Sequence, residues 1–238
     1  MRIIRNQFLI VFLCAIHLVF ICELKAGNDE KIYQISPELV DPDATVQTRA
    51  LYDFLRLQFR HRIISGQTHS HYNTILPITG NAPLLRAGDF QHFTEGYAYL
   101  WKDGGHTFGK HDDGSVDQLI SWYNQTRKKG IVSYQWHWHS PTGGEPSTNT
   151  FYTDLTSFDI ARAITPGTSE YNDVIRDMDD IAAELKRFRD AGIPVLWRPL
   201  HEAGGGWFWW GAGGAEACKE LYNMMFDRFM THHELHNL

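Results

Sequence analysis

The sequence has 238 residues, of which 43% are hydrophobic and 13% are aromatic, and its formal net charge is −6. This length is sufficient for one sizeable hydrophobic core. The acidic balance, with no basic run beyond the N-terminal segment, argues against nucleic acid as a partner.

The first 26 residues have the composition of a secretory signal peptide. Arg2 and Arg5 precede an apolar run over 8–21, and Ala26 ends a plausible cleavage site. The run is short for a bilayer span. We therefore expect a secreted, periplasmic or cell-surface protein whose mature domain is 27–238, with no membrane span after cleavage.

Cysteine usage agrees with a core that needs no covalent support. Cleavage of the signal would remove Cys14 and Cys22 and leave Cys218 alone. A single cysteine cannot form an internal disulfide, so the mature domain depends on its packing.

The rest of the chain alternates between helical and extended patterns. Residues 27–44 are polar and predict a lead-in strap. Helices are expected over 45–59, 115–129, 171–191 and 215–232, and strands over 62–65, 84–87, 131–138 and 195–200. Gly192 and Pro194 stop the third of these helices.

This order predicts a parallel α/β sheet, either a barrel or a doubly wound sheet. No glycine-rich phosphate loop follows the first strand. Polar side chains instead follow every strand, as at the catalytic rim of a (β/α)8 barrel. They are His69, His71, Asp89, His137, His139, His201 and Glu202.

The segment 195–211 is the most informative stretch. Its apolar run ends at Arg198-Pro199, and His201 and Glu202 follow side by side. Glycines and a block of four aromatic residues, 207–210, come next. A carboxyl group at a strand end can act as a general acid, and flat rings beside it offer a sugar a stacking surface. The combination indicates glycoside chemistry.

These residues resemble the acid/base signature of glycoside hydrolase family 26, whose best-known members are β-mannanases. The helix 171–191 with its Ala-Gly-Ile-Pro ending, the pair Trp136-His137 and the lead-in 63–67 carry further parts of the resemblance. It covers about 46–238. It implies a (β/α)8 TIM barrel and a retaining double-displacement reaction on β-1,4-mannosidic linkages of mannan or galactomannan.

The resemblance also implies roles for single residues. Glu202 matches the general acid/base, while His137, His201 and Trp207 match positions that contact the sugar at the cleavage point. The family's nucleophile is a glutamate on the seventh strand, and nothing in this sequence matches it. No metal or organic cofactor is implied. We expect a monomer that acts on a mannan-type polysaccharide.

Only four β/α units can be counted, whereas a barrel needs eight. We therefore interpret 27–238 as the N-terminal portion of the catalytic domain, truncated after about four units and lacking half of the catalytic pair.

Several alternatives stay open. His69 and His71, with His137, His139, His201 and Glu202, could be ligands of a metal-dependent barrel hydrolase. The chain could be a non-catalytic carbohydrate-binding remnant, or its specificity could be for β-1,3-xylan or mixed-linkage β-glucan. Arg198 could orient a carboxylate or form a structural ion pair. Phe208, Trp209 and Trp210 are expected in the core.

Overall fold

The computed structural model describes residues 34–99 and 109–238. The predicted signal peptide, residues 1–26, lies outside this part. The chain divides into two units, 1–39 and 40–238. Residues 34–39 of the first contain no helix or strand, and the second holds all the elements below.

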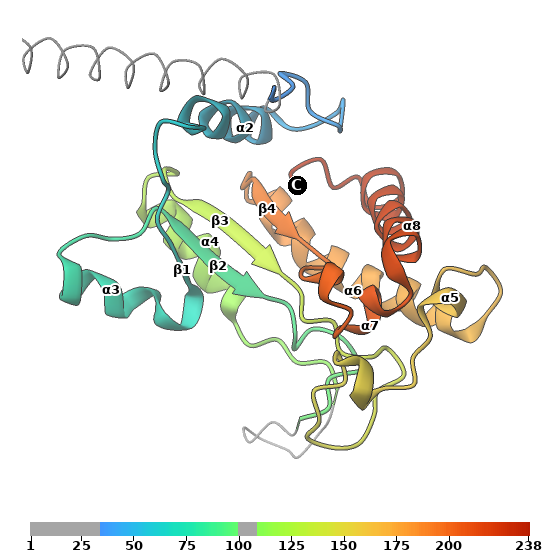
Figure 1. Cartoon of the computed structure of the whole chain (residues 1–238). Helices are drawn as coiled ribbons and strands as arrows, with labels where there is room; N and C mark the ends of the chain where they lie inside the picture. The colour runs from blue at the N-terminus through green and yellow to red at the C-terminus, as the bar shows by residue number, and fades with distance from the viewer. Residues whose placement is uncertain (1–33, 100–108) are drawn as a thin grey trace, which may run out of the picture. The chain divides into compact units, whose positions relative to one another are not determined.

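The described part of the second unit contains one parallel sheet of four strands, in the order β1-β2-β3-β4. The strands are β1 (Gly66–Thr68), β2 (Leu85–Asp89), β3 (Ile131–Gln135) and β4 (Val195–Arg198). Each strand pairs with the next one in the chain (Figure 1), and helices fill the connections. Sequential parallel pairing of this kind is the pattern of a (β/α) barrel, as predicted.

The four long helices lie close to their predicted ranges. The long helices are α2 (Val46–Gln58), α4 (Ser115–Gln125), α6 (Ser169–Asp190) and α8 (Gly214–Asp227), and a π-helical turn, Arg228–His232, follows α8. The short helices α3 (Tyr72–Thr79), α5 (Ile160–Ala163) and α7 (Trp209–Ala212) were not predicted. Three 3-10 turns, η1 (His69–His71), η2 (Thr153–Leu155) and η3 (Ala203–Gly205), complete the set.

Helix α6 provides much of the core. The Thr168 side chain caps its first turn by accepting from the Tyr171 N–H. Gly192, at φ +67°, turns the chain after its end. One face of the helix is fully buried against the sheet and the neighbouring helices. Its members are Val174, Met178, Ile181, Ala182, Leu185 and Phe188.

The two faces of the sheet are distinguished by Tyr134. Its ring lies 5.4 Å from that of Phe188 in α6, and its hydroxyl is 3.0 Å from Ser115 Oγ at the start of α4. Tyr134 therefore points toward the helices. Because side chains alternate along a strand, Gln135 points the other way, toward the barrel interior.

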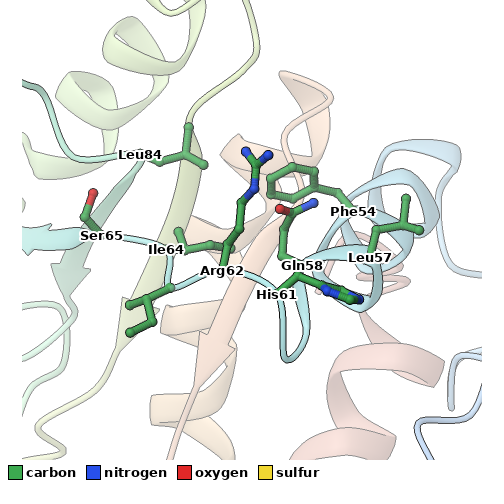
Figure 2. A pocket seen from close by; sticks show the side chains of 9 residues that line it. Phe54, Leu57, Gln58, His61, Arg62, Ile64, Ser65 and Leu84 are labelled. Atoms are coloured by element: carbon green, nitrogen blue, oxygen red, sulfur yellow. The ribbon is translucent and has the colours of Figure 1, made fainter.

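The first predicted strand was wrong in position. Residues 62–65 form no strand, and Ile63 is fully exposed. The strand begins at Gly66, where a Cβ would lie only 3.0 Å from Leu85 Cδ2 on the neighbouring strand. This tight approach suits glycine. Figure 2 shows the apolar side chains of 62–65 and α2 around a cavity of about 660 Å³ instead.

Other predicted ends were too long for identifiable reasons. The helix over 115–129 stops early because Arg127 and Lys128 adopt left-handed φ angles of 56° and 62°. The strand over 195–200 stops at Arg198 because Pro199 has no N–H to donate to a ladder.

Candidate active site

A row of three hydrogen-bonded side chains crosses the sheet at the carboxyl ends of its strands. Asp89, Gln135 and Arg198 are direct register partners on β2, β3 and β4. Arg198 Nη1 donates to Gln135 Oε1 over 3.0 Å, and Gln135 Nε2 donates to Asp89 Oδ2 over 3.0 Å. Since Gln135 faces the interior, the whole row does.

The carboxylate of Asp89 is surrounded by donors. Oδ1 accepts from the backbone N–H groups of Gln91 (3.1 Å) and His137 (3.0 Å), and Oδ2 also bonds His137 Nδ1. Burial alone would raise the pKa of Asp89, but these bonds and the charge attraction of the His137 ring hold the pKa below its ordinary value. Asp89 is therefore an anion near neutral pH, and its oxygens are occupied.

His137 in turn contacts His201. Their Nε2 atoms lie 3.1 Å apart, and the two rings meet edge to face with centroids 4.4 Å apart. Burial of His201, followed by the nearby His137 charge, lowers the pKa of His201 to about 4. His201 is thus neutral at pH 7. The structure brings together these two residues, which the sequence predicted to share one site.

Aromatic side chains wall the histidine pair. The Phe208 ring lies 5.9 Å from His137 and 5.4 Å from His201, and Phe151 lies 5.2 Å from His137. Trp210 Nε1 donates to the His201 carbonyl over 2.9 Å. Phe208, Trp209 and Trp210 are buried, which confirms their predicted place in the core. The core block therefore also fixes the position of His201.

Glu202 lies on a tight loop beyond β4 and its side chain is exposed. Leu200 and Glu202 both adopt left-handed φ angles, 48° and 57°. Non-glycine residues rarely adopt this conformation, which is found at functional sites where the surroundings enforce it. The loop turns the Glu202 carboxylate away from the core and toward Trp207, whose Nε1 donates to Glu202 Oε2 over 3.1 Å.

Trp207 is the one member of the aromatic block that stays open, with 49% of its surface exposed. Two backbone hydrogen bonds hold its loop against the loop that follows β3. Thr153 N donates to the Trp207 carbonyl over 2.8 Å, and Trp209 N donates to the Phe151 carbonyl over 3.1 Å. An exposed ring on a fixed backbone can serve as a stacking surface.

The structure also shows the surroundings of two further candidate residues, Arg198 and His139. Arg198 neither bonds a carboxylate directly nor forms an ion pair within the described residues; its guanidinium donates to the Gln135 side chain. His139 is fully buried, with Nδ1 3.0 Å from Thr150 Oγ1. Burial, followed by the charges of His92 and His137, lowers its pKa to about 4.

Asp89 is the residue whose importance the sequence did not reveal. Its place after the second strand put it at the rim, but nothing nearby in the sequence linked it to His137, which is 48 positions away. The link follows from the parallel register, which places Asp89 opposite Gln135, just before His137.

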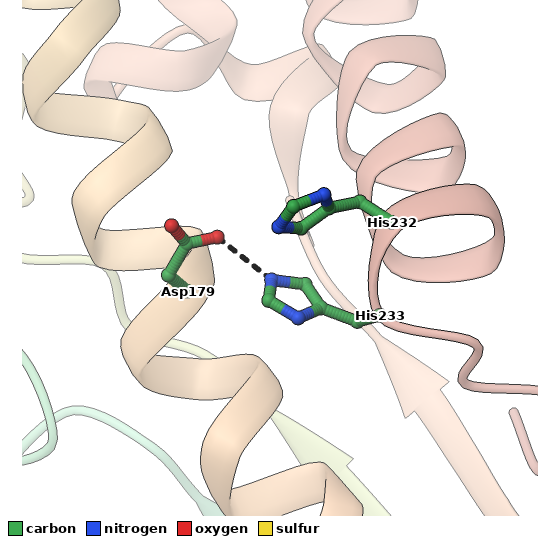
Figure 3. Close-up of side chains that lie close together, drawn as sticks. All are labelled: Asp179, His232 and His233. Carbon is green, nitrogen blue, oxygen red and sulfur yellow. Dashed lines mark hydrogen bonds and ion pairs between the residues drawn. The ribbon is translucent and has the colours of Figure 1, made fainter.

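The histidines after β1 do not gather with the others. His69 Nε2 lies 2.9 Å from Gln118 Oε1, and His69 and His71 line a cavity of about 460 Å³ together with Asp89. Within residues 34–99 and 109–238, two other groups have a spacing that could hold a metal ion. They are Asp179, His232 and His233 (Figure 3), and Asp41, Asp43 and His236.

In the first of these groups, the negative charge of Asp179 is already balanced by neighbouring side chains. Arg228 donates two hydrogen bonds of 2.8 Å to Asp179, and His233 Nε2 lies 2.7 Å from the same carboxylate. On its other side, His233 Nδ1 is 3.0 Å from Lys186 Nζ. A cation would have to displace two positive side chains, so this group has a structural role between α6 and the end of α8.

The family of the chain follows from its similarity to known proteins. The sequence profile described as glycosyl hydrolase family 26 matches residues 40–238. The chain belongs to glycosyl hydrolase family 26. A relative from Thermothelomyces thermophilus, named mannan endo-1,4-beta-mannosidase, is 40% identical over 215 residues, 87% of this chain and 42% of that protein. The mannan endo-1,4-beta-mannosidase B of Piromyces sp is 32% identical, over 86% of this chain and 35% of that protein.

Solved structures of mannanases are also similar to this chain. The GH26-CBM35 beta-(1,4)-mannanase of Podospora anserina superposes with a TM-score of 0.74 at 40% identity, over 86% of this chain and 45% of that one. A beta-mannanase from a symbiotic protist of the termite Reticulitermes speratus, complexed with gluco-manno-oligosaccharide, gives 0.72 at 34% identity, over 87% and 64%. The family 26 chain described here thus spans about two fifths of those curated relatives and contains four β/α units of the barrel.

Proposed function

We propose that this chain forms the acid/base half of the active site of a secreted endo-β-1,4-mannanase. The carrying observation is the exposed Glu202 carboxylate at the end of β4, held by the Trp207 N–H beside a walled histidine pair. An exposed acid next to an open aromatic ring fits a polysaccharide that lies across the rim. The named relatives act on mannan, which supports mannan over β-1,3-xylan or mixed-linkage β-glucan as substrate.

The proposed reaction is a retaining double displacement. A carboxylate attacks the anomeric carbon while Glu202 gives its proton to the glycosidic oxygen, so the leaving sugar departs as an alcohol. Glu202 then takes a proton from water, and the resulting hydroxide releases the glycosyl group from the nucleophile. His137, His201 and Trp207 would contact the sugar at the cleavage point.

The nucleophile is proposed to lie outside this sequence. Asp89 is a partly buried carboxylate in contact with His137, but four donors already occupy its two oxygens. A carboxylate held in this way is a poor nucleophile, because attack would require it to give up those bonds. We therefore assign Asp89 no covalent role.

Export and domain limits belong to the same proposal. Residues 1–26 would direct secretion to the medium, the periplasm or the cell surface, and 27–238 would be the N-terminal portion of a monomeric catalytic domain. Among the described residues, no helix is long and apolar enough to cross a membrane. N-terminal sequencing of exported protein should begin at Gly27; a protein retaining Met1 would refute the cleavage.

The test of the function is Glu202→Gln in the full-length protein. Loss of a general acid/base should lower kcat on mannan by about 10²- to 10⁴-fold. Aryl mannosides with good leaving groups need no protonation, so the variant should still form the glycosyl-enzyme from them quickly. Added azide, a nucleophile that needs no base, should restore the second step. Glu216→Gln, an exposed change in α8, is the matched control. Unchanged turnover of mannan by Glu202→Gln would remove Glu202 from the mechanism.

A further inference from the structure

The proton positions of the histidine pair follow from groups that can only donate or only accept. Arg198 has donors alone, so the Gln135 atom that faces it must be Oε1, and Nε2 must face Asp89. Gln135 therefore presents a donor to the Asp89 carboxylate. The orientation of an otherwise ambiguous amide is fixed by the cation at the far end of the row.

The same logic continues to His137. Asp89 is ionised and carries no proton, so the ring nitrogen in contact with Oδ2 must donate. His137 Nδ1 thus carries a proton. When this is the only proton on the ring, the other nitrogen, Nε2, is an acceptor. It lies 3.1 Å from His201 Nε2, and the hydrogen bond between them requires that His201 Nε2 be the donor.

The last atom of the chain of contacts is His201 Nδ1. It is buried and has no hydrogen-bond partner within the part of the chain that the structure describes. With the proton on Nε2, this nitrogen has a lone pair and no hydrogen. An unpaired acceptor costs less in a buried position than an unpaired N–H donor. The burial of His201 Nδ1 and the proton on His137 Nδ1 therefore both favour a His201 ring that carries its proton on Nε2.

We propose that Asp89 is a positioning residue that fixes the tautomers of both histidines, with the proton on Nδ1 of His137 and on Nε2 of His201. His201 Nδ1 then remains a buried acceptor without a proton. The tautomers follow from the contacts alone; only their effect on turnover rests on the proposed function.

The test is the side-chain nitrogen spectrum of the full chain labelled with ¹⁵N-histidine, recorded near pH 7. In the wild type, His137 should show a protonated Nδ1 and His201 a protonated Nε2. This measurement needs neither substrate nor a variant. An unprotonated His137 Nδ1 would overturn the proposal, whether or not the protein acts on mannan.

Asp89→Asn gives the sharper result. The Asn oxygen keeps the two backbone N–H groups of Gln91 and His137, which places its NH₂ against His137 Nδ1 and against Gln135 Nε2, whose hydrogen bond is lost. His137 must then accept at Nδ1 and carry its proton on Nε2, which forces His201 to carry its proton on Nδ1. Both tautomers should reverse, and the thermal melt of the variant reports whether the fold is kept.

Asp113→Asn is the matched control. Asp113 Oδ2 contacts His92 Nδ1 over 3.0 Å, and Oδ1 accepts from Ser115 N. This pair therefore repeats the carboxylate–histidine contact of Asp89 on a different histidine. The change should leave His137 and His201 as in the wild type. In the full-length enzyme, Asp89→Asn should lower kcat/KM by about 10²-fold and Asp113→Asn should not. Unreversed tautomers in folded Asp89→Asn would refute the assignment.

Discussion

The indole N–H of Trp207 reaches back over five residues to Glu202 Oε2, at 3.1 Å. Both side chains are exposed, so the carboxylate has access to solvent and substrate while one of its oxygens is held in place. The backbone of Trp207 is itself held by Thr153 from the preceding loop. The position of the proposed acid thus depends on a second loop that contributes no reacting group.

Trp207→Phe should separate the two roles of the indole. The phenyl ring keeps a stacking surface but has no N–H for Glu202. Loss of a hydrogen bond to a charged group is worth about 1.4 kcal/mol in this setting, or about tenfold in kcat/KM on mannan. Trp207→Ala should cost more, mainly through KM. Equal kinetics for the Phe variant and the wild type would show that the hydrogen bond has no part in catalysis.

Gly88 marks a close approach inside the sheet. A Cβ at this position would lie 2.3 Å from the ring of Tyr134 on β3. Gly88→Ala should therefore lower the free energy of unfolding by about 1–3 kcal/mol, because the ring must move in a packed core. Urea denaturation measures this loss. Gly204→Ala is the control, since a Cβ there meets nothing within 4 Å; a stable Gly88→Ala would contradict the packing.

The buried His139 predicts a loss of stability in acid. Burial lowers its pKa to about 4 in the folded chain, below the usual 6.5 of an unfolded histidine. Between these values the unfolded state binds a proton that the folded state refuses. The contribution of His139 to the free energy of unfolding is therefore complete above pH 6.5. It is lost as the pH falls toward 4, by about 3 kcal/mol at most.

His139→Asn should flatten this dependence. The Asn amide can still reach Thr150 Oγ1, the partner of His139 Nδ1, but it does not titrate. Denaturation midpoints of the two proteins from pH 7 to pH 4 provide the comparison. The wild type should lose more stability than the variant over this range. His201 titrates in both proteins and does not account for the difference. Parallel curves would show that His139 is free to take up a proton in the folded state.

Chelation should leave activity on mannan unchanged. His69 is bonded to Gln118 rather than grouped with His137 and His201, and the proposed acid and nucleophile need no metal. The full-length enzyme, dialysed against a chelator and assayed with and without added zinc, provides the measurement. Activity that is lost and then restored by zinc would favour the metal-dependent hydrolase over the glycosidase.

The parts of the fold with long patterns were predictable from sequence. Helix α6 has a regular apolar stripe and a glycine end, and it appears within two residues of the predicted range. β1 has only three residues, and its place depends on contact with Leu85 of another strand. The short helix α3 contains Pro77, which hides it from a pattern search. Local sequence does not encode such contacts.

The candidate site likewise has residues that the sequence predicts and one that depends on contacts between strands. Glu202, His201, His137 and Trp207 lie in motifs, and the structure brings them together as two hydrogen-bonded pairs. Asp89 lies in no motif, and its side-chain partners Gln135 and His137 come from β3 and the residues just after it. Only the register of the sheet joins it to them.

That register makes the site a reporter of correct folding. Asp89, Gln135 and Arg198 share a face only because three strands pair without a slip. A shift of one residue between β2 and β3 would turn Gln135 toward the helices and bring Tyr134 into the interior. The cation that orients the amide, the anion that holds His137 and the ring that follows would all lose their partners at once. A misaligned sheet would therefore lose the proposed site together with its packing. In the full-length enzyme, activity per molecule should then measure how faithfully these strands align.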